Sequence, residues 1–147
     1  MSLKEKLAED LKSAMKEKNV VQKNVVQLIR AGVLQIEKDK RIVLDDEGVL
    51  DVIAKQLKQR RDSLPDYEKS GREDLIAELK AEMDVLMGYL PTQLSYEEIE
   101  KIVKDAVEKT GASSMKDMGK IMAAVMPLTK GRADGKVINE IAKSLLS

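Results

Sequence analysis

The residues best equipped for chemistry in this sequence are cations that crowd a predicted break between two helices. Residues 114–143 read as a helix, a glycine-marked turn and a second helix. Free backbone N–H groups at a helix N-terminus, together with lysine and arginine side chains, can hold a phosphate group. The residues of this candidate nucleic-acid-binding site are Lys130, Gly131, Arg132 and Lys136 at the turn, with Lys116 and Lys120 on the helix before it.

The same turn has a purely structural interpretation. Gly131 would end one helix and Asp134 would cap the next, with the cations around them exposed to water. A carboxylate at the cap would also repel an anion at that helix N-terminus. On the residues alone we prefer this interpretation, and the phosphate site stays open as the alternative.

A nucleotide-binding loop is rejected at this turn. Residues 131–137 are superficially like a Walker A loop, yet the spacing between the two glycines is one residue short. Val137 stands where a serine or threonine would bind magnesium, and no strand is predicted before the turn.

Catalysis has few candidate residues, because the chain contains neither histidine nor cysteine. The usual general base near neutral pH and the strongest nucleophile are therefore missing, together with the soft metal ligands. The acidic pairs Asp45–Asp46 and Glu97–Glu98 are sequence neighbours at predicted helix starts, where they complement the helix dipole rather than face one reaction site. We expect no catalytic residue, no metal site and no cofactor.

Three other patterns have both a functional and a structural interpretation. The basic run 55–61 could contact a nucleic-acid backbone, but a solvated helix face is preferred. Four methionines at helical spacing could form an adaptable binding surface, but core packing is preferred; they are Met115, Met118, Met122 and Met126. Gly32 lies on the apolar face of its helix, where it either lets another helix approach closely or is merely tolerated. The residues do not decide between these two roles.

The elements that must position these residues are helices. Hydrophobic residues make up 43% of the chain, and its three aromatic residues are all tyrosine. Such an aliphatic, methionine-rich core suits helix-on-helix packing, and the apolar residues recur at steps of three and four. We predict an all-α protein in which residues 1–93 form a four-helix bundle and residues 94–147 form a small three-helix domain.

Capping residues and helix breakers set the expected helix ends. The expected helix starts are Ser2, Asn19, Asp45, Arg72, Ser95, Ser113 or Ser114, and Asp134. Pro65 is expected to kink or break the third helix, although residues 67–69 can resume the helical path before Ser70–Gly71 ends it. The apolar stripe expected on the second helix comprises Val21, Val25, Leu28, Ile29, Val33 and Ile36.

Charge and hydropathy limit the partners and the cellular location that the sequence allows. The 26 basic and 26 acidic residues give a net charge of zero, so only a local patch would favour nucleic acid. No N-terminal apolar run resembles a signal peptide, and the longest uninterrupted apolar run, residues 121–126, is too short to span a bilayer. With no cysteine present, we predict a cytoplasmic protein that has no membrane partner.

Three segments carry a family resemblance: residues 58–95, residues 114–127 and residues 130–146. They resemble the GatB/YqeY family, and the chain is similar to a stand-alone YqeY-like protein. The family also includes the C-terminal tail of the aspartyl/glutamyl-tRNA amidotransferase B subunit. The resemblance implies an all-helical N-terminal part, a three-helix C-terminal part, and a link to tRNA, which that tail contacts. The family's glycine-basic-alanine turn matches Gly131, Arg132 and Ala133.

The resemblance also implies a family label of carbon–nitrogen ligase with glutamine as amide donor. The catalytic portion of the B subunit and the Ser–Lys machinery of the amidase subunit have no counterpart in this chain. Pro65 also stands where the family pattern has a continuous helix.

The leading hypothesis is a non-catalytic accessory protein that binds tRNA or associates with a tRNA-dependent amidotransferase. It predicts binding that weakens steeply with salt. The alternatives are a protein-interaction module that docks on a translation partner, and a ligase that acts as part of a complex. The expected partners are therefore tRNA, an amidotransferase or another translation protein.

Overall fold

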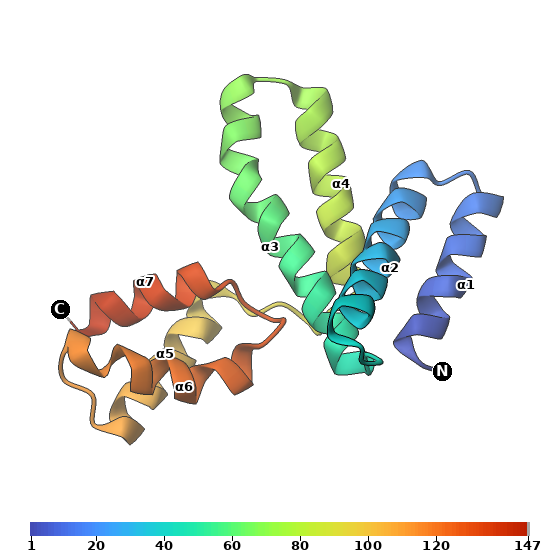
Figure 1. The fold of residues 1–147 in the computed structure, drawn as a ribbon. Helices are drawn as coiled ribbons and strands as arrows, with labels where there is room; N and C mark the ends of the chain where they lie inside the picture. Colours follow the sequence, from blue (N-terminus) through green and yellow to red (C-terminus); the bar gives the residue numbers. More distant parts are fainter. Residues whose placement is uncertain (147) are drawn as a thin grey trace. The chain divides into compact units, whose positions relative to one another are not determined.

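The computed structural model describes residues 1–146, and in that range it is helical without any strand, which confirms the all-α prediction. Two compact units follow one another, unit 1 from Met1–Leu90 and unit 2 from Pro91–Ser147 (Figure 1). Unit 1 contains α1 (Leu3–Lys16), α2 (Val20–Lys40), α3 (Asp46–Ser70) and α4 (Glu73–Tyr89). Unit 2 contains α5 (Tyr96–Thr110), the 3-10 turn η1 (Met115–Asp117), α6 (Met118–Thr129) and α7 (Gly135–Leu146).

Unit 1 is built from two helix hairpins, α1–α2 and α3–α4 (Figure 1). Helix α2 packs against α1, α3 and α4, so one helix carries much of the core. The buried side chains are aliphatic: Leu7, Val25, Val26, Ile29, Val33, Val49, Val52, Ile53, Leu57, Leu86 and Leu90. Such a core is stabilised by apolar burial and by the close fit of branched side chains between helices.

At several of the expected helix starts a side chain satisfies free backbone donors, whereas Arg72 and Ser114 form no such cap. Asn19 Oδ1 accepts from Gln22 N at 3.1 Å, and Asp45 Oδ1 accepts from Gly48 N at 2.8 Å. Ser2 accepts from the N–H of the third helical residue at 3.1 Å. At Ser95 both bonds of the capping box are present, since the Glu98 side chain also accepts from Ser95 N. These caps are local, which is why the sequence predicts them.

Pro65 does not break α3, so the predicted break is wrong, while the open alternative that the helical path resumes at residues 67–69 agrees with the structure. The helix runs without interruption from Asp46 to Ser70 with Pro65 inside it, and Gly71, at a φ of 69°, ends it. Proline removes one backbone donor. Helix α3 packs against α4, with Leu57 of α3 and Leu79 of α4 buried, whereas residues 65–70 are exposed.

Gly32 marks a close approach of α2 to α3. A Cβ atom at Gly32 would lie 3.0 Å from Val52 Cγ1 and 3.2 Å from Gln56 Nε2. The Gln56 amide uses this proximity to donate to the Leu28 carbonyl at 3.1 Å. Of the two roles left open for this glycine, the structure supports close helix packing.

Unit 2 packs α5, α6 and α7 around a second aliphatic core. Its buried side chains are Ile99, Val103, Ala106, Ile121, Val125, Ile138, Ile141, Ala142 and Leu146. The structure divides the chain after Leu90, whereas the expected division lay after residue 93. None of the helices within residues 1–146 combines the length and the apolar character needed to cross a bilayer.

Candidate functional site

The turn between α6 and α7 folds tightly because of one glycine. Gly131 has a φ of 73°, a left-handed conformation that glycine adopts without a steric cost. It brings the next two backbone N–H groups back to the end of α6, where Arg132 N and Ala133 N both donate to the Thr129 carbonyl, at 2.8 and 3.1 Å. The predicted helix end at Gly131 is confirmed.

Asp134 caps α7, as the structural interpretation of this turn predicts. Its Oδ1 accepts from Lys136 N at 3.0 Å, and its carbonyl accepts from Val137 N and Ile138 N at 3.1 and 3.3 Å. Two of the N–H groups that would have faced a phosphate, those of Lys136 and Val137, are therefore paired within the protein. An anion at this helix end would also meet the Asp134 carboxylate.

Arg132 and Gly131 hold the chain segment that precedes α5. Arg132 Nε donates to the Thr92 carbonyl at 3.2 Å, and the Arg132 carbonyl accepts from Leu94 N at 2.8 Å. Gln93 Nε2 donates to the Gly131 carbonyl at 2.8 Å. We call these contacts between residues 92–94 and 131–132 the clasp. Sequence reasoning missed it, because bonds to backbone groups so far apart leave no residue pattern.

The six predicted site residues do not form one cluster along α6. Lys116 and Lys120 lie at its N-terminal end, while Lys130, Gly131, Arg132 and Lys136 follow its C-terminal end. The 12 residues of α6 span about 18 Å at the usual helical rise. Lys120 pairs with Asp117 at 3.9 Å, and a hydrogen bond from Ser113 N lowers the pKa of that carboxyl. Binding of nucleic acid by these residues stays a prediction.

The basic run on α3 is partly balanced by acids. Lys58 pairs with Asp62 at 3.6 Å, and Arg60 Nε lies 3.7 Å from Glu82 Oε2 on α4. The arrangement fits the preferred interpretation, a helix face with local ion pairs.

The methionine stripe divides into two kinds of position. Met118 and Met122 pack against the core of unit 2. Met115 and Met126 are each 46% exposed. Core packing therefore explains two of the four methionines.

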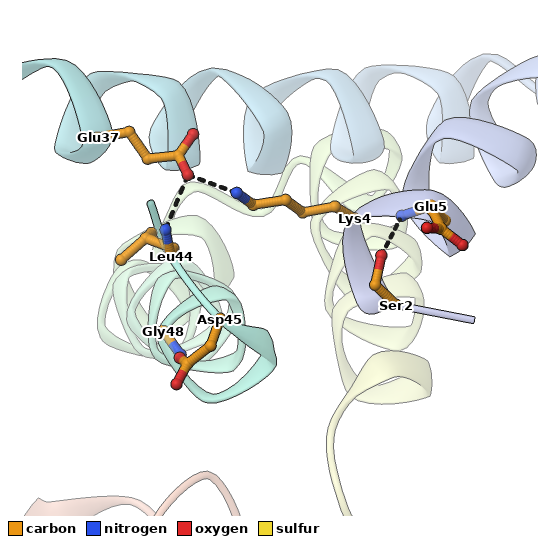
Figure 2. A network of polar contacts seen from close by, with 7 residues as sticks. All are labelled: Ser2, Lys4, Glu5, Glu37, Leu44, Asp45 and Gly48. Carbon is orange, nitrogen blue, oxygen red and sulfur yellow. Dashed lines mark hydrogen bonds and ion pairs between the residues drawn. The ribbon is translucent and has the colours of Figure 1, made fainter. Parts of the chain in front are cut away.

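A polar network ties the start of α1 to the end of α2 (Figure 2). The Lys4 ammonium pairs with the Glu37 carboxylate, which also accepts from Leu44 N at 2.8 Å. The hydrogen bond from Lys4, followed by the one from Leu44, lowers the pKa of Glu37. Leu3 N donates to Asp46 Oδ1 at 2.9 Å, so the α1 terminus also holds the start of α3. These contacts fix the connector between α2 and α3.

Tyr89 and Asp10 form a second partly buried polar contact, between α4 and α1. The Tyr89 hydroxyl donates to Asp10 Oδ2, and the Lys6 ammonium lies 5.7 Å from the ring centre. Burial, followed by the hydrogen bond to Asp10, raises the pKa of Tyr89. The phenol therefore stays protonated at neutral pH and serves as a hydrogen-bond donor. Among residues 1–146 no cluster of three or more acids could hold a metal ion.

A pocket lies between α1 and α2. Its volume is about 120 Å³, and it is lined by Lys4, Leu7, Arg30, Val33, Leu34 and Glu37. Leu34 lies outside the apolar stripe predicted for α2 and is 64% exposed. Leu28, predicted to lie inside that stripe, is 49% exposed, and that assignment is wrong. The stripe is narrower than predicted, because Val25, Val26, Ile29 and Val33 suffice to fill the core on this side.

The helices and their two aliphatic cores define a helical protein of two units, and sequence comparison places it in a family. The family described as Yqey-like protein matches residues 4–146. This chain belongs to that family.

Curated relatives cover both units. A protein of Pyrenophora tritici-repentis named "Altered inheritance of mitochondria protein 41, mitochondrial" is 34% identical over 131 residues, 87% of this chain and 71% of the relative. A protein of that name in Kluyveromyces lactis is 34% identical over 134 residues, 82% of this chain and 70% of the relative. A third, in Vanderwaltozyma polyspora, is 32% identical over 120 residues, 76% of this chain and 64% of the relative. The chain thus spans about two thirds of the length of these relatives.

These names correct two expectations drawn from the sequence. The relatives are named for the inheritance of mitochondria, which overturns the expected function as a tRNA-binding or amidotransferase-associated accessory protein, with its alternatives. They are also named as mitochondrial proteins, which overturns the expected cytoplasmic location. The family resemblance led to the first error, because it transferred the setting of the amidotransferase to a chain without the catalytic portion. The second error came from the composition, since the prediction of a cytoplasmic location rests on the absence of cysteine and of an N-terminal apolar run. The individual partners expected from the sequence stay untested.

Proposed function

We propose that this chain serves the inheritance of mitochondria and that it does so by binding other molecules rather than by catalysis. The observation that carries the proposal is the extent of the similarity to the relatives named for that process. The aligned region of the Pyrenophora tritici-repentis relative takes in 87% of this chain, more than either unit alone provides.

The chemistry of the described residues supports a binding role. Without histidine or cysteine, acid–base and nucleophilic catalysis would depend on carboxylates, lysines and tyrosines. The carboxylate of Glu37 is held ionised by Lys4, and the phenol of Tyr89 is held protonated by burial and by Asp10. Both groups are thereby committed to structural contacts.

The experiment is complementation in a Kluyveromyces lactis strain that lacks its own relative of this chain. The chain is expressed behind a mitochondrial targeting segment, and the fraction of daughter cells that receive labelled mitochondria is counted. We expect the chain to restore this fraction toward that obtained with the Kluyveromyces lactis protein itself.

Two controls make the result specific. An Ile53→Asp variant places a charge in the core of unit 1, where Ile53 is fully buried, and should not complement. A Val43→Asp variant places the same charge at a side chain that is 85% exposed and should complement fully. If the chain accumulates in mitochondria and daughter cells inherit no better than with an empty vector, the proposal is wrong.

We further infer a common origin of unit 2 and the C-terminal tail of the aspartyl/glutamyl-tRNA amidotransferase B subunit. The support is the resemblance over residues 114–127 and 130–146. This inference concerns ancestry and transfers no activity to the chain. It predicts that the tail has the same helix order as α5–α7, with a clasp between the segment before its first helix and the turn before its last. A different helix order in a solved tail would contradict it.

A further inference from the structure

We propose that the exposed face of α2, together with the pocket beside it, is a docking groove for an acidic amphipathic helix of a partner protein. The proposal rests on the binding role proposed above and adds the chemistry of the partner. We call this surface, made of Val20, Asn24, Gln27, Leu28, Arg30, Ala31, Leu34 and Gln35, the α2 groove.

The α2 groove is an apolar stripe in a strongly charged protein. Three aliphatic side chains are exposed along it, Val20 by 62%, Leu28 by 49% and Leu34 by 64%. Asn24, Gln27, Ala31 and Gln35 lie exposed between them and carry no charge. Charged residues make up 35% of the chain, yet residues 20–36 contain only Lys23 and Arg30. An exposed apolar stripe with a polar border is typical of an interaction surface.

The charge of this region selects an acidic partner. Both charged residues within 20–36 are basic, and residues 1–41 as a whole contain ten bases and six acids. Within the described range, 1–146, Arg30 makes no hydrogen bond or ion pair in the protein, so its guanidinium is available to a carboxylate. Arginine binds carboxylates in a two-pronged geometry and is enriched where binding energy concentrates.

The pocket between α1 and α2 provides an anchor point at the edge of the α2 groove. Leu7 and Val33 are buried at its base, and Leu34 and Arg30 border it. Lys4 and Glu37, also part of its lining, are paired with each other (Figure 2). Its volume is about 120 Å³, and an engineered cavity of about 150 Å³ is known to accept benzene. One apolar side chain of a partner therefore fits here, with an acid beside it for Arg30.

A helix fits this surface better than a bilayer does. Helices that lie on membranes carry tryptophan, phenylalanine or leucine on a broad apolar face. This chain has no phenylalanine or tryptophan, and three amide side chains interrupt the stripe. Amides remain hydrogen-bonded against the polar edges of a protein helix but lose their partners in lipid. Recognition of an amphipathic helix by such a groove uses apolar anchors at steps of three and four.

The test is a titration of the full chain with a labelled synthetic helix, followed by fluorescence anisotropy. The probe is a peptide of about 20 residues, long enough to be helical, with leucine at every third and fourth position and glutamate on the remaining face. We expect saturable binding that a Leu34→Glu or an Arg30→Glu variant weakens by at least about tenfold. Binding should also weaken with added salt.

Matched controls distinguish specific binding at the α2 groove from non-specific binding of the peptide. A Val43→Glu variant also converts an exposed aliphatic residue of unit 1 to glutamate, at 85% exposure, and should bind like the unchanged chain. Circular dichroism of each variant should show unchanged helix content. A peptide with lysine in place of glutamate should bind at least about tenfold more weakly, because Lys23 and Arg30 repel it.

The proposal is overturned if the chain does not bind the glutamate peptide, or if it binds the lysine peptide equally well. It is also overturned if the unchanged chain binds only to phosphatidylcholine–phosphatidylglycerol vesicles, or if the chain self-associates and the Leu34→Glu variant abolishes that self-association. The last two would assign the surface to a bilayer or to a second copy of the chain. Because the peptide is synthetic, the titration and the complementation experiment can fail independently. Absence of peptide binding would overturn the docking groove alone, and absence of complementation would overturn the proposed function alone.

Discussion

Two glycines on the helices of unit 1 have opposite surroundings. Gly32 faces α3, whereas a Cβ at Gly88 on α4 would find open space. Alanine favours a helix over glycine by up to about 1 kcal/mol. We expect Gly88→Ala to raise the free energy of unfolding toward that value. We expect Gly32→Ala to raise it less or to lower it, because Val52 and Gln56 must move. Urea denaturation measures both, and equal gains would contradict the close packing at Gly32.

The lowered pKa of Glu37 determines how its ion pair with Lys4 contributes to stability as pH changes. Its pKa lies below the ordinary glutamate value, so the unfolded chain takes up a proton at higher pH than the folded chain does. The stabilising contribution is therefore complete above the ordinary value of about 4.3 and is lost as pH falls through the lower, folded value. We expect the stability difference between the unchanged chain and Glu37→Gln to shrink as pH falls below that point.

Thermal unfolding measured between neutral and acidic pH tests this expectation. Glu9→Gln is the matched control, because Glu9 also lies in the α1–α2 hairpin but makes no hydrogen bond or ion pair with the described residues. The prediction fails if the Glu37→Gln difference stays constant down to the lowest pH at which the protein folds.

At the scale of the element, α3 continues through a residue that disfavours a helix. Proline within a helix interior costs about 3 kcal/mol or more, yet α3 continues through Pro65. We expect Pro65→Ala to stabilise unit 1 by about 1–3 kcal/mol, since the missing backbone donor is restored and no buried contact is lost. Asp66→Ala, at the next exposed position, is the control and should change stability little. If Pro65→Ala gives no gain, the helix is already interrupted there in solution.

The elements that the sequence predicts well are those with local causes. Asn19, Asp45, Ser95 and Asp134 cap their helices through donors two or three residues away, and such spacing is visible in a sequence. The width of the apolar stripe on α2 is not visible in this way. Leu28 and Leu34 both fit a helical period of 3.6, and only the packing of α1, α3 and α4 around α2 leaves both of them exposed.

On the scale of the whole molecule, the candidate sites show where sequence reasoning stops. The turn at Gly131 is predicted as a pair of helix caps, and the structure has these caps. The structural role of Arg132 could not be predicted from the sequence, because its side chain donates a hydrogen bond to the Thr92 carbonyl, 40 positions earlier. The α2 groove depends on three helices that cover the rest of α2, so it emerges only once the hairpins of unit 1 have assembled.

The charge distribution is also a property of the whole molecule that the zero net charge conceals. Residues 1–41 contain ten bases and six acids, while residues 42–90 contain seven bases and twelve acids. The two hairpins of unit 1 therefore carry opposite net charge, which favours their association and leaves α1–α2 as the side that attracts acidic partners. Composition alone would have suggested an electrostatically neutral protein.

The clasp has a consequence for how the chain matures on the ribosome. The hydrophobic core of unit 1 is made only of residues up to Leu90. Unit 1 can therefore fold as soon as residue 90 has emerged, as N-terminal domains generally do. The start of α5 is held by Gly131 and Arg132, which are synthesised much later. The segment 92–94 therefore stays unanchored until nearly the whole of unit 2 has been translated. This delay separates the two folding events in time, and it reduces the chance that the two sets of aliphatic helices mispair.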